Sequence, residues 1–287
     1  MLEGEPGMKV TFFGTTMLLF DDGTDQVLFD GHFTRPPLWK YLLNGKIRTD
    51  KAMADELMSR YDFSRLRAVF VSHSHPDHVM DVPYIANRTG AEVYGSDSTK
   101  SICLGGKVPK ERIHLFRDDE AEQVGAFRVT ALPSLHSAPT IISNDLGKTI
   151  KKPVRQPARV KKYREGGSRD FLVEHGRQTF LIRPSFNYIE GQLDDVRADV
   201  LFLGIGTMDK ASGETIETFF AETLDKVRPQ KVIPLHWDDF FTPLDRPIKN
   251  MPRIADNTPA NMDRTARACA ARGIEFIVQY PLITLSL

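Results

Sequence analysis

The segment Ser72-His73-Ser74-His75-Pro76-Asp77-His78 places four potential metal ligands within six positions. Histidine offers a neutral nitrogen to zinc, and aspartate offers an anionic oxygen. The segment directly follows residues 68–71, a short, wholly apolar run that is typical of a strand buried on both faces. A loop at the end of such a strand can turn its first two histidines toward one point and Asp77 and His78 toward another. The spacing therefore suits two neighbouring metal ions.

Short strands and helices are expected on both sides of this segment. Before it, the pattern predicts strands at 9–13, 16–20 and 26–29, joined by tight turns, and a helix at 49–60. After it, the pattern predicts, in chain order, a helix at 79–88, strands at 92–94, 127–132, 171–173, 179–182, 200–203 and 231–234, helices at 215–227 and 259–272, and a strand at 275–278. Each half begins with hairpin-type strands and continues with alternating strands and helices. This organisation predicts an α+β protein in which two mixed β-sheets pack face to face between helices, an αββα sandwich.

The composition excludes several classes of protein. Hydrophobic residues make up 41 % and charged residues 26 % of the 287 residues, as in soluble globular proteins. The 38 basic and 38 acidic residues cancel, so neither a generally basic nucleic-acid binder nor an acidic tail is indicated. We expect no membrane span and no secretory signal. Cys103 and Cys269 are expected to be reduced thiols, which favours a cytoplasmic location.

Residues 148–164 have a different composition, with eight Lys or Arg, two prolines and no acid. We expect a single domain over residues 1–287, with an N-terminal half at about 8–140, a basic insert at about 141–168 and a C-terminal half at about 169–287. The insert is expected to be a loop or flap rather than core. It has three interpretations: a solvated flap, a lid near an anionic substrate, or a nucleic-acid contact. The third is disfavoured because Tyr163 is the only aromatic residue among the charges.

The HxHxDH arrangement of His73, His75, Asp77 and His78 resembles the signature of the metallo-β-lactamase fold superfamily. The resemblance covers nearly the whole chain from about Met8, except the basic insert. It implies that His73, His75 and His136 hold one metal and that Asp77, His78 and His236 hold the second. It also implies that Asp30, in Phe29-Asp30-Gly31, orients a ligand histidine without binding metal itself.

One position departs from the pattern of this superfamily. Most of its hydrolases have a metal-bridging aspartate after a strand in the second half, where this chain has Ser185. A serine hydroxyl is a poor zinc ligand, so the bridge would be left to water or hydroxide. Asp194 and Asp195 are alternatives that lie well past the strand end.

The other histidines and aromatic residues near the motifs have open interpretations. His114 and His175 are expected to be ordinary surface or hydrogen-bonded histidines. His32 is the best candidate among the remaining histidines for a pocket residue, and Arg35 and Trp39 either line a substrate cleft or pack within their loop. The aromatic residues after the last ligand are Trp237, Phe240 and Phe241. Two interpretations are equally open for them: packing in the core, or forming an apolar wall for an acyl or lipid-like substrate.

The resemblance implies a metal-dependent hydrolase that cleaves a small ester, lactone or amide. One or two zinc ions are the expected cofactor, with manganese or iron as alternatives, and a zinc-bound hydroxide would be the nucleophile. Asp77 would also accept a hydrogen bond from this hydroxide. The alternatives are a phosphodiesterase or nuclease, and a non-catalytic metal-binding or ligand-sensing protein. A small-molecule substrate is the expected partner, nucleic acid is not, and the sequence does not determine the oligomeric state.

Overall fold

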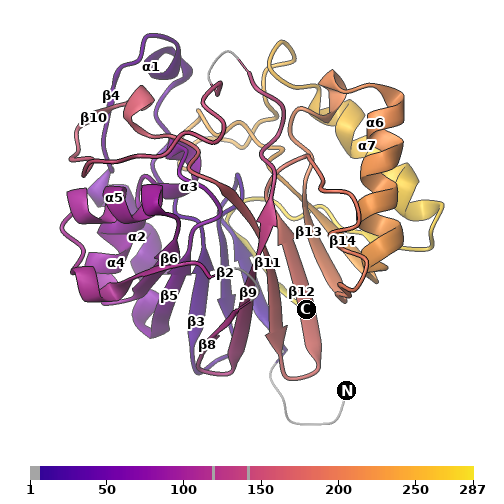
Figure 1. Ribbon diagram of the computed structural model, residues 1–287, viewed down its shortest axis with the longest axis horizontal. Helices are drawn as coiled ribbons and strands as arrows, with labels where there is room; N and C mark the ends of the chain where they lie inside the picture. Colours follow the sequence, from indigo (N-terminus) through magenta and orange to yellow (C-terminus); the bar gives the residue numbers. More distant parts are fainter. Residues whose placement is uncertain (1–6, 118–119, 141–142) are drawn as a thin grey trace.

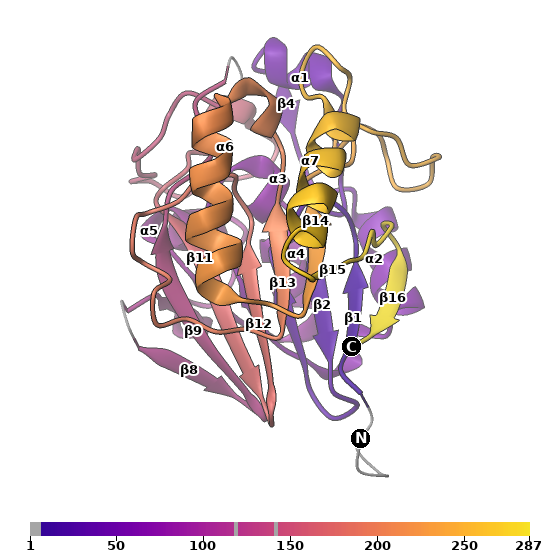
Figure 2. The same ribbon diagram turned by 90° about the vertical axis from the view of Figure 1, so that its right-hand side faces the viewer.

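Two stacked β-sheets form the centre of the molecule, and helices cover their outer faces (Figure 1). The computed structural model describes residues 7–117, 120–140 and 143–287. In Figure 1, α2, α4 and α5 lie beside one sheet and α6 and α7 beside the other, and Figure 2 shows α6 and α7 crossing the outer face of the second sheet. The described helices are α1 (Leu38–Leu42), α2 (Lys51–Arg60), α3 (Pro76–Val79), α4 (Val82–Thr89), α5 (Asp97–Gly105), α6 (Gly213–Phe220) and α7 (Thr258–Ala270).

The described part of each sheet contains seven strands. The first has the spatial order β16 (Ile283–Ser286), β1 (Lys9–Phe12), β2 (Leu18–Asp21), β3 (Gln26–Phe29), β5 (Leu66–Phe70), β6 (Glu92–Gly95), β7 (Ile113–Leu115). The second has the order β15 (Glu275–Phe276), β14 (Lys231–Leu235), β13 (Val200–Gly204), β12 (Gln178–Arg183), β11 (Ser168–His175), β9 (Phe127–Ser134), β8 (Ala121–Val124). A separate ribbon pairs β4 (Lys46–Ile47) with β10 (Ala158–Arg159).

Both sheets change from antiparallel to parallel pairing along the chain. In the first sheet β16, β1, β2 and β3 form the antiparallel part, and the pairs from β3 to β7 are parallel. In the second sheet the change occurs at β12. Hairpins can join antiparallel strands, whereas parallel strands need longer crossover connections, usually helices. Each half of the chain therefore has the expected order, with hairpin strands first and alternating strands and helices afterwards.

The two sheets pack against each other through phenylalanine rings on their facing sides. Phe20 of β2 meets Phe180 of β12 at a centroid distance of 5.2 Å, and Phe29 of β3 meets Phe171 of β11 at 5.2 Å. These phenylalanines are essentially inaccessible to solvent, so they fix the spacing of the sheets. The strand ends that carry the histidines are thereby held at the same end of the sandwich.

Several elements differ from the sequence-based expectation. The helix expected at 79–88 is two helices, α3 and α4, and the helix α5 and the strand β16 were not expected. Strands β8 and β9 come from the expected N-terminal half but join the second sheet, because β9 pairs with β11 along eight residues. Conversely, β16 from the end of the chain pairs with β1.

The basic insert is a packed strap across the first half of the molecule. Its first residues, 141–142, lie outside the described residues. Over residues 150–163, the aliphatic and tyrosine side chains are buried while the basic side chains between them are exposed. The buried side chains are Ile150, Val154, Ala158, Val160 and Tyr163. The apolar positions therefore hold the strap, and a wholly solvated flap does not describe it.

Within the described chain, no helix has the length and apolarity that a membrane crossing requires.

Candidate metal centre

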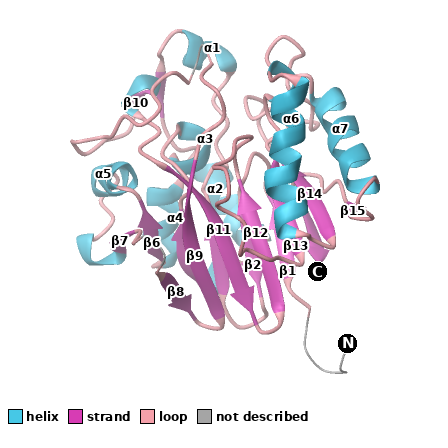
Figure 3. Cartoon of the chain, turned by 45° about the vertical axis from the view of Figure 1, so that its right-hand side comes forward, coloured by secondary structure: helices cyan, strands magenta, loops and turns pink. Residues whose placement is uncertain are grey.

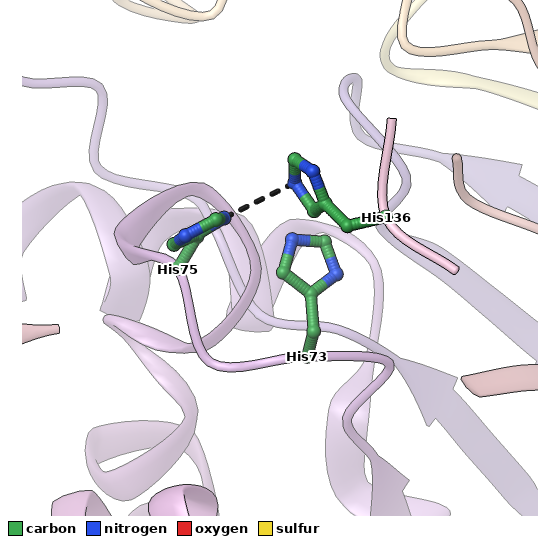
Figure 4. Close-up of side chains that lie close together, drawn as sticks. All are labelled: His73, His75 and His136. Carbon is green, nitrogen blue, oxygen red and sulfur yellow. Dashed lines mark hydrogen bonds between the residues drawn. The ribbon is translucent and has the colours of Figure 1, made fainter. Parts of the chain in front are cut away.

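Three histidines from two strand ends converge on one point (Figure 4). His73 follows β5, His75 immediately precedes α3, and His136 follows β9. One ring nitrogen from each lies within 4.8 Å of the others. The three rings stand at nearly right angles to one another, with centroids 4.7 to 5.0 Å apart. The sandwich fold thus brings together residues that are 63 positions apart in the chain.

The hydrogen bonds of these histidines leave one nitrogen of each directed at the common point. Nδ1 of His136 donates to the carbonyl oxygen of Ser137 at 2.8 Å, so its Nε2 is the unprotonated nitrogen. This Nε2 lies 3.2 Å from Nδ1 of His75, whose other nitrogen, Nε2, lies 3.0 Å from Oδ1 of Asp145. Nε2 of His73 is buried and has no hydrogen-bond partner within the described chain. An unpartnered buried nitrogen beside two converging lone pairs fits a metal ion.

The environment of this cluster favours neutral imidazoles. Burial, followed by the neighbouring histidines, lowers the pKa of His73 well below its usual range. Burial and His75 lower the pKa of His136 to about 4. Because metal binding requires the neutral ring, both side chains are in the correct protonation state at neutral pH.

A second trio lies directly beside the first. Oδ2 of Asp77 is 3.4 Å from Nε2 of His78 and 3.4 Å from Nε2 of His236. Asp77 and His78 belong to α3, and His236 follows β14. The centroids of the His73 and His78 rings are 3.8 Å apart, so the two trios are in direct contact.

Asp30 is the hydrogen-bonding centre beneath the second trio. Its Oδ2 lies 2.8 Å from Nδ1 of His78 and accepts hydrogen bonds from the hydroxyls of Thr16 and Ser72, at 2.5 and 2.9 Å. Its Oδ1 accepts the amide of Ser72 at 2.7 Å. Since Nδ1 of His78 is engaged, Nε2 is the nitrogen that faces Asp77 and His236. The sequence analysis expected Asp30 in this orienting role but missed Thr16, which carries no motif.

Within the second trio, the pKa values of Asp77 and His78 are shifted in opposite directions. Burial disfavours the charged form of His78, but Asp77 and Asp30 outweigh it and raise its pKa to about 10. Burial opposes ionisation of Asp77, yet His78 and His236 hold the pKa of its carboxyl well below the usual range. In the described structure the Asp77 carboxylate lies between the rings of His78 and His236. A divalent cation bound between these three groups would take the place of the extra proton on His78.

The backbone at both strand ends adopts conformations that are rare outside glycine. Asp30 and His236 have φ values of 58° and 57°, in the left-handed region. The amide of His236 donates to the carbonyl oxygen of Thr15 at 2.6 Å, which ties the two halves together. A Cβ at Gly206 would lie 2.8 Å from the carbonyl oxygen of His236, so this position requires glycine. Such strain, held by surrounding bonds, is typical of functional sites.

Ser185 is buried in the loop after β12, close to the segment that carries His136. The amide of Phe186 donates to the Ser137 hydroxyl at 3.0 Å, and Nδ2 of Asn187 donates to the carbonyl oxygen of His136 at 2.7 Å. The two carboxylates considered as alternatives lie elsewhere. Asp194 pairs with Lys226, and Asp195 is exposed.

Of the remaining candidates, His32 is the one whose pKa is affected by the charges of the second trio. Burial lowers its pKa to about 3, and Asp77 and Arg35 are among the charges that act on it. His114 pairs with Glu92, and His175 pairs with Asp22, both away from the trios. These two are therefore ordinary hydrogen-bonded histidines.

The aromatic residues after His236 are mainly core, and the guanidinium of Arg35 is held in a buried ion pair. Trp237 and Phe241 are buried, and the ring of Phe240 packs 5.1 Å from that of His236. Arg35 forms a fully buried ion pair with Asp238 at 2.7 Å. Trp39, in contrast, is exposed on α1.

The insert supplies one residue to the site that the sequence analysis missed. Asp145 accepts from His75, and its other oxygen accepts the amide of Glu165 at 3.3 Å. The Glu165 carboxylate in turn accepts from Gly147 and Ser168, and its carbonyl oxygen accepts the amide of Ser74 at 2.9 Å. The insert is therefore bonded to the histidine loop at both of its ends. A single aspartate in a loop gives no sequence signal of such a role.

Comparisons with known proteins identify the family to which the chain is similar. The sequence profile of a family described as the beta-lactamase superfamily domain matches residues 25–237, a range that includes both trios. A UPF0173 metal-dependent hydrolase from Roseiflexus castenholzii is 26% identical over 247 residues, which cover 86% of this chain and 88% of the relative.

Solved structures with the same architecture cover nearly the whole chain. The metallo-beta-lactamase fold protein YhfI from Bacillus subtilis superposes with a TM-score of 0.59 and 16% identity, over 97% of this chain and 99% of YhfI. Zn(2+)-bound PqqB from Methylobacterium extorquens superposes with a TM-score of 0.52 and 12% identity, over 94% of this chain and 87% of PqqB. The predicted metallo-β-lactamase fold is thereby confirmed.

Proposed function

The chain belongs to the beta-lactamase superfamily domain family, and from this membership we propose that it is a metal-dependent hydrolase of small esters, lactones or amides. The observation that carries the proposal is the pair of adjacent trios, His73, His75 and His136 beside Asp77, His78 and His236, with their ligand atoms turned inward. The relative from Roseiflexus castenholzii, named a metal-dependent hydrolase, supports the same class of activity.

Zinc is the metal that suits these donors best. The two trios together offer five imidazole nitrogens and one carboxylate oxygen, a set typical of zinc sites, although manganese and iron also accept it. The zinc-bound PqqB has the same fold, which supports this choice. We propose two ions, one for each trio, because the trios have no ligand in common.

The chain's own residues would prepare the site for water attack. Zinc, when bound, lowers the pKa of water toward neutrality and so supplies a nucleophile without a serine or cysteine. Asp77 is held as a carboxylate and can accept a hydrogen bond from the attacking water. Asp30, Thr16 and Asp145 fix the rings of His78 and His75, so the ligand atoms need little reorganisation.

Apolar side chains beside the trios support an acyl-type substrate. The ring of Phe240 packs against His236, and Leu135 is exposed next to His136. An acyl group can contact the exposed Leu135 while its carbonyl approaches the trios.

A substrate panel with matched variants tests the proposal. Zinc-loaded wild type should hydrolyse aryl esters, lactones or amides, and His75→Ala and Asp77→Ala should each lose at least about a thousandfold in rate. Asp195→Asn, which changes an exposed carboxylate, should match wild type. Hydrolysis of bis(p-nitrophenyl) phosphate alone would favour the phosphodiesterase alternative. Metal binding with no turnover on any of these substrates would favour a sensor.

A further inference from the structure

The short helix α1 presents an unpartnered apolar face at one end of the molecule. Its inward residue Tyr41 is buried, whereas Trp39, Leu42 and Leu43 on the outward face are 56%, 57% and 71% exposed. Figures 1 and 3 show α1 at the end where α3 and the strap lie, projecting beyond the sheets. A helix on the surface of a globular protein normally has polar side chains on this face. The apolar side chains therefore indicate an interaction surface.

Basic residues lie on this helix and on or directly after the two short strands next to it. Strand β4 follows α1, and Lys46 lies opposite Arg159 in the β4–β10 ribbon. The amide of Lys161 donates to Asn44, directly after the helix. Among the described residues, no carboxylate forms an ion pair with any member of the basic ring, which comprises Lys40, Lys46, Arg48, Arg159 and Lys161. The net charge of the chain is zero, so this is a local concentration of positive charge.

A cavity beside the helix adds a place for an anionic group. It has a volume of about 580 Å³ and is lined by Lys40, Arg48 and Lys51 together with Pro36 and Pro37. Its one acidic lining residue is Asp50, whose carboxylate already accepts the amides of Ala52 and Met53. The charge that remains at the cavity is therefore positive.

We propose that α1 and the neighbouring basic ring dock the protein onto an anionic lipid surface. Tryptophan and leucine enter the boundary between headgroups and acyl chains, while lysine and arginine attract anionic headgroups. The cavity at Lys40, Arg48 and Lys51 would receive a headgroup phosphate. A second copy of the chain fits less well, because a symmetric contact would bring two positive rings together.

A chain of edge-to-face and tilted ring contacts connects this surface to the candidate metal centre. The ring of Tyr41 lies 4.9 Å from that of Phe241, which lies 4.4 Å from Phe240, which in turn lies 5.1 Å from His236. Docking through α1 would place the trios close to the lipid interface. An amphiphilic substrate could then reach them without leaving its surface completely.

Vesicle flotation tests the proposal without measuring hydrolysis. Wild type should float with vesicles of equal parts phosphatidylcholine and phosphatidylglycerol, and less with phosphatidylcholine alone. Leu42→Ser with Leu43→Ser should reduce the partition coefficient by about tenfold or more, and Lys40→Gln with Arg48→Gln by about tenfold on anionic vesicles only. The control pair Val278→Ser and Ile283→Ser, at residues 41% and 50% exposed elsewhere, should float like wild type.

Tryptophan emission provides a second readout. The chain has two tryptophans, and Trp237 is buried, so a blue shift on adding anionic vesicles reports Trp39. His75→Ala should show the same shift as wild type, which separates docking from the proposed hydrolase activity. Wild type that stays unbound to anionic vesicles at low salt would overturn the proposal, as would unchanged flotation of the leucine variant. So would a dimer in ultracentrifugation that the leucine substitutions convert to monomer.

Discussion

Nε2 of His75 lies 3.0 Å from Oδ1 of Asp145, so a residue of the insert fixes which nitrogen of this histidine faces His136. Burial opposes ionisation of Asp145, but the hydrogen bond to His75 lowers the pKa of its carboxyl. The strap is thus part of the construction of the three-histidine trio rather than a loop beside it. Most of its basic residues are exposed to solvent, whereas its two acids, Asp145 and Glu165, form hydrogen bonds inside the structure.

Replacing Asp145 should weaken metal binding at the three-histidine trio. Asp145→Ala should lower zinc affinity there by about 10- to 100-fold, since His75 loses the group that orients it. Asp145→Asn keeps a hydrogen-bond acceptor and should lose less. Competition with a chromophoric chelator measures the affinity, with Asp195→Asn as control. Equal affinity of the alanine variant and wild type would mean that the strap does not orient His75.

Ser185 should contribute little to metal binding. Its side chain forms no hydrogen bond within the described chain, and a hydroxyl is a poor zinc ligand. Ser185→Ala should therefore change zinc affinity and turnover by no more than about twofold. Ser185→Asp should tighten zinc binding if this loop occupies the usual bridging position. A large loss in the alanine variant would show instead that the hydroxyl takes part in the site.

The buried pair of Arg35 and Asp238 should be important for stability. Arg35 also donates to the carbonyl oxygen of Phe13, and Asp238 accepts the amide of Thr15 at 2.8 Å. Arg35→Met leaves a buried carboxylate without its partner and should cost about 3 to 5 kcal/mol in the free energy of unfolding. Adding Asp238→Asn should recover part of this loss. Urea denaturation measures both, and a single variant as stable as wild type would contradict the assignment.

Asp81 should make stability depend on pH. Burial raises the pKa of its carboxyl from 3.8 to about 6, against the opposing hydrogen bond from Thr34. Between pH 3.8 and about pH 6, the folded state binds more protons than the unfolded state. The free energy of unfolding therefore falls as the pH rises through this interval. Asp81→Asn should gain up to about 3 kcal/mol relative to wild type between pH 4 and pH 8. Chelator-treated protein should be used, and a difference independent of pH would refute this origin.

Much of the fold was predictable because its signals are local. The buried strands at 68–71 and 200–203 and the helix at 259–272 follow from apolar runs and periodicity. Strand β16 was missed because its pairing with β1 joins opposite ends of the chain. Helix α5 was missed because Asp97–Gly105 mixes small polar and apolar residues, although Ser96 caps it through the amide of Thr99.

The candidate site was predictable where a compact motif exists and not where single residues come from distant loops. The geometry brings together all six residues expected as ligands. Thr16 and Asp145 could not be found because each is one polar residue without fixed spacing from the motif. The strap did carry a signal, since apolar residues alternate with basic ones between 150 and 160, as in a segment with one buried side.

The most direct test of the central claim is zinc stoichiometry, measured by mass spectrometry on wild type, His136→Ala and His236→Ala. Each substitution removes one ligand from a different trio. We predict about two zinc ions per wild-type chain and about one in each variant, with the retained ion held by the intact trio. A wild type that binds no metal, or variants that bind as much as wild type, would contradict the assignment of these residues to two metal sites.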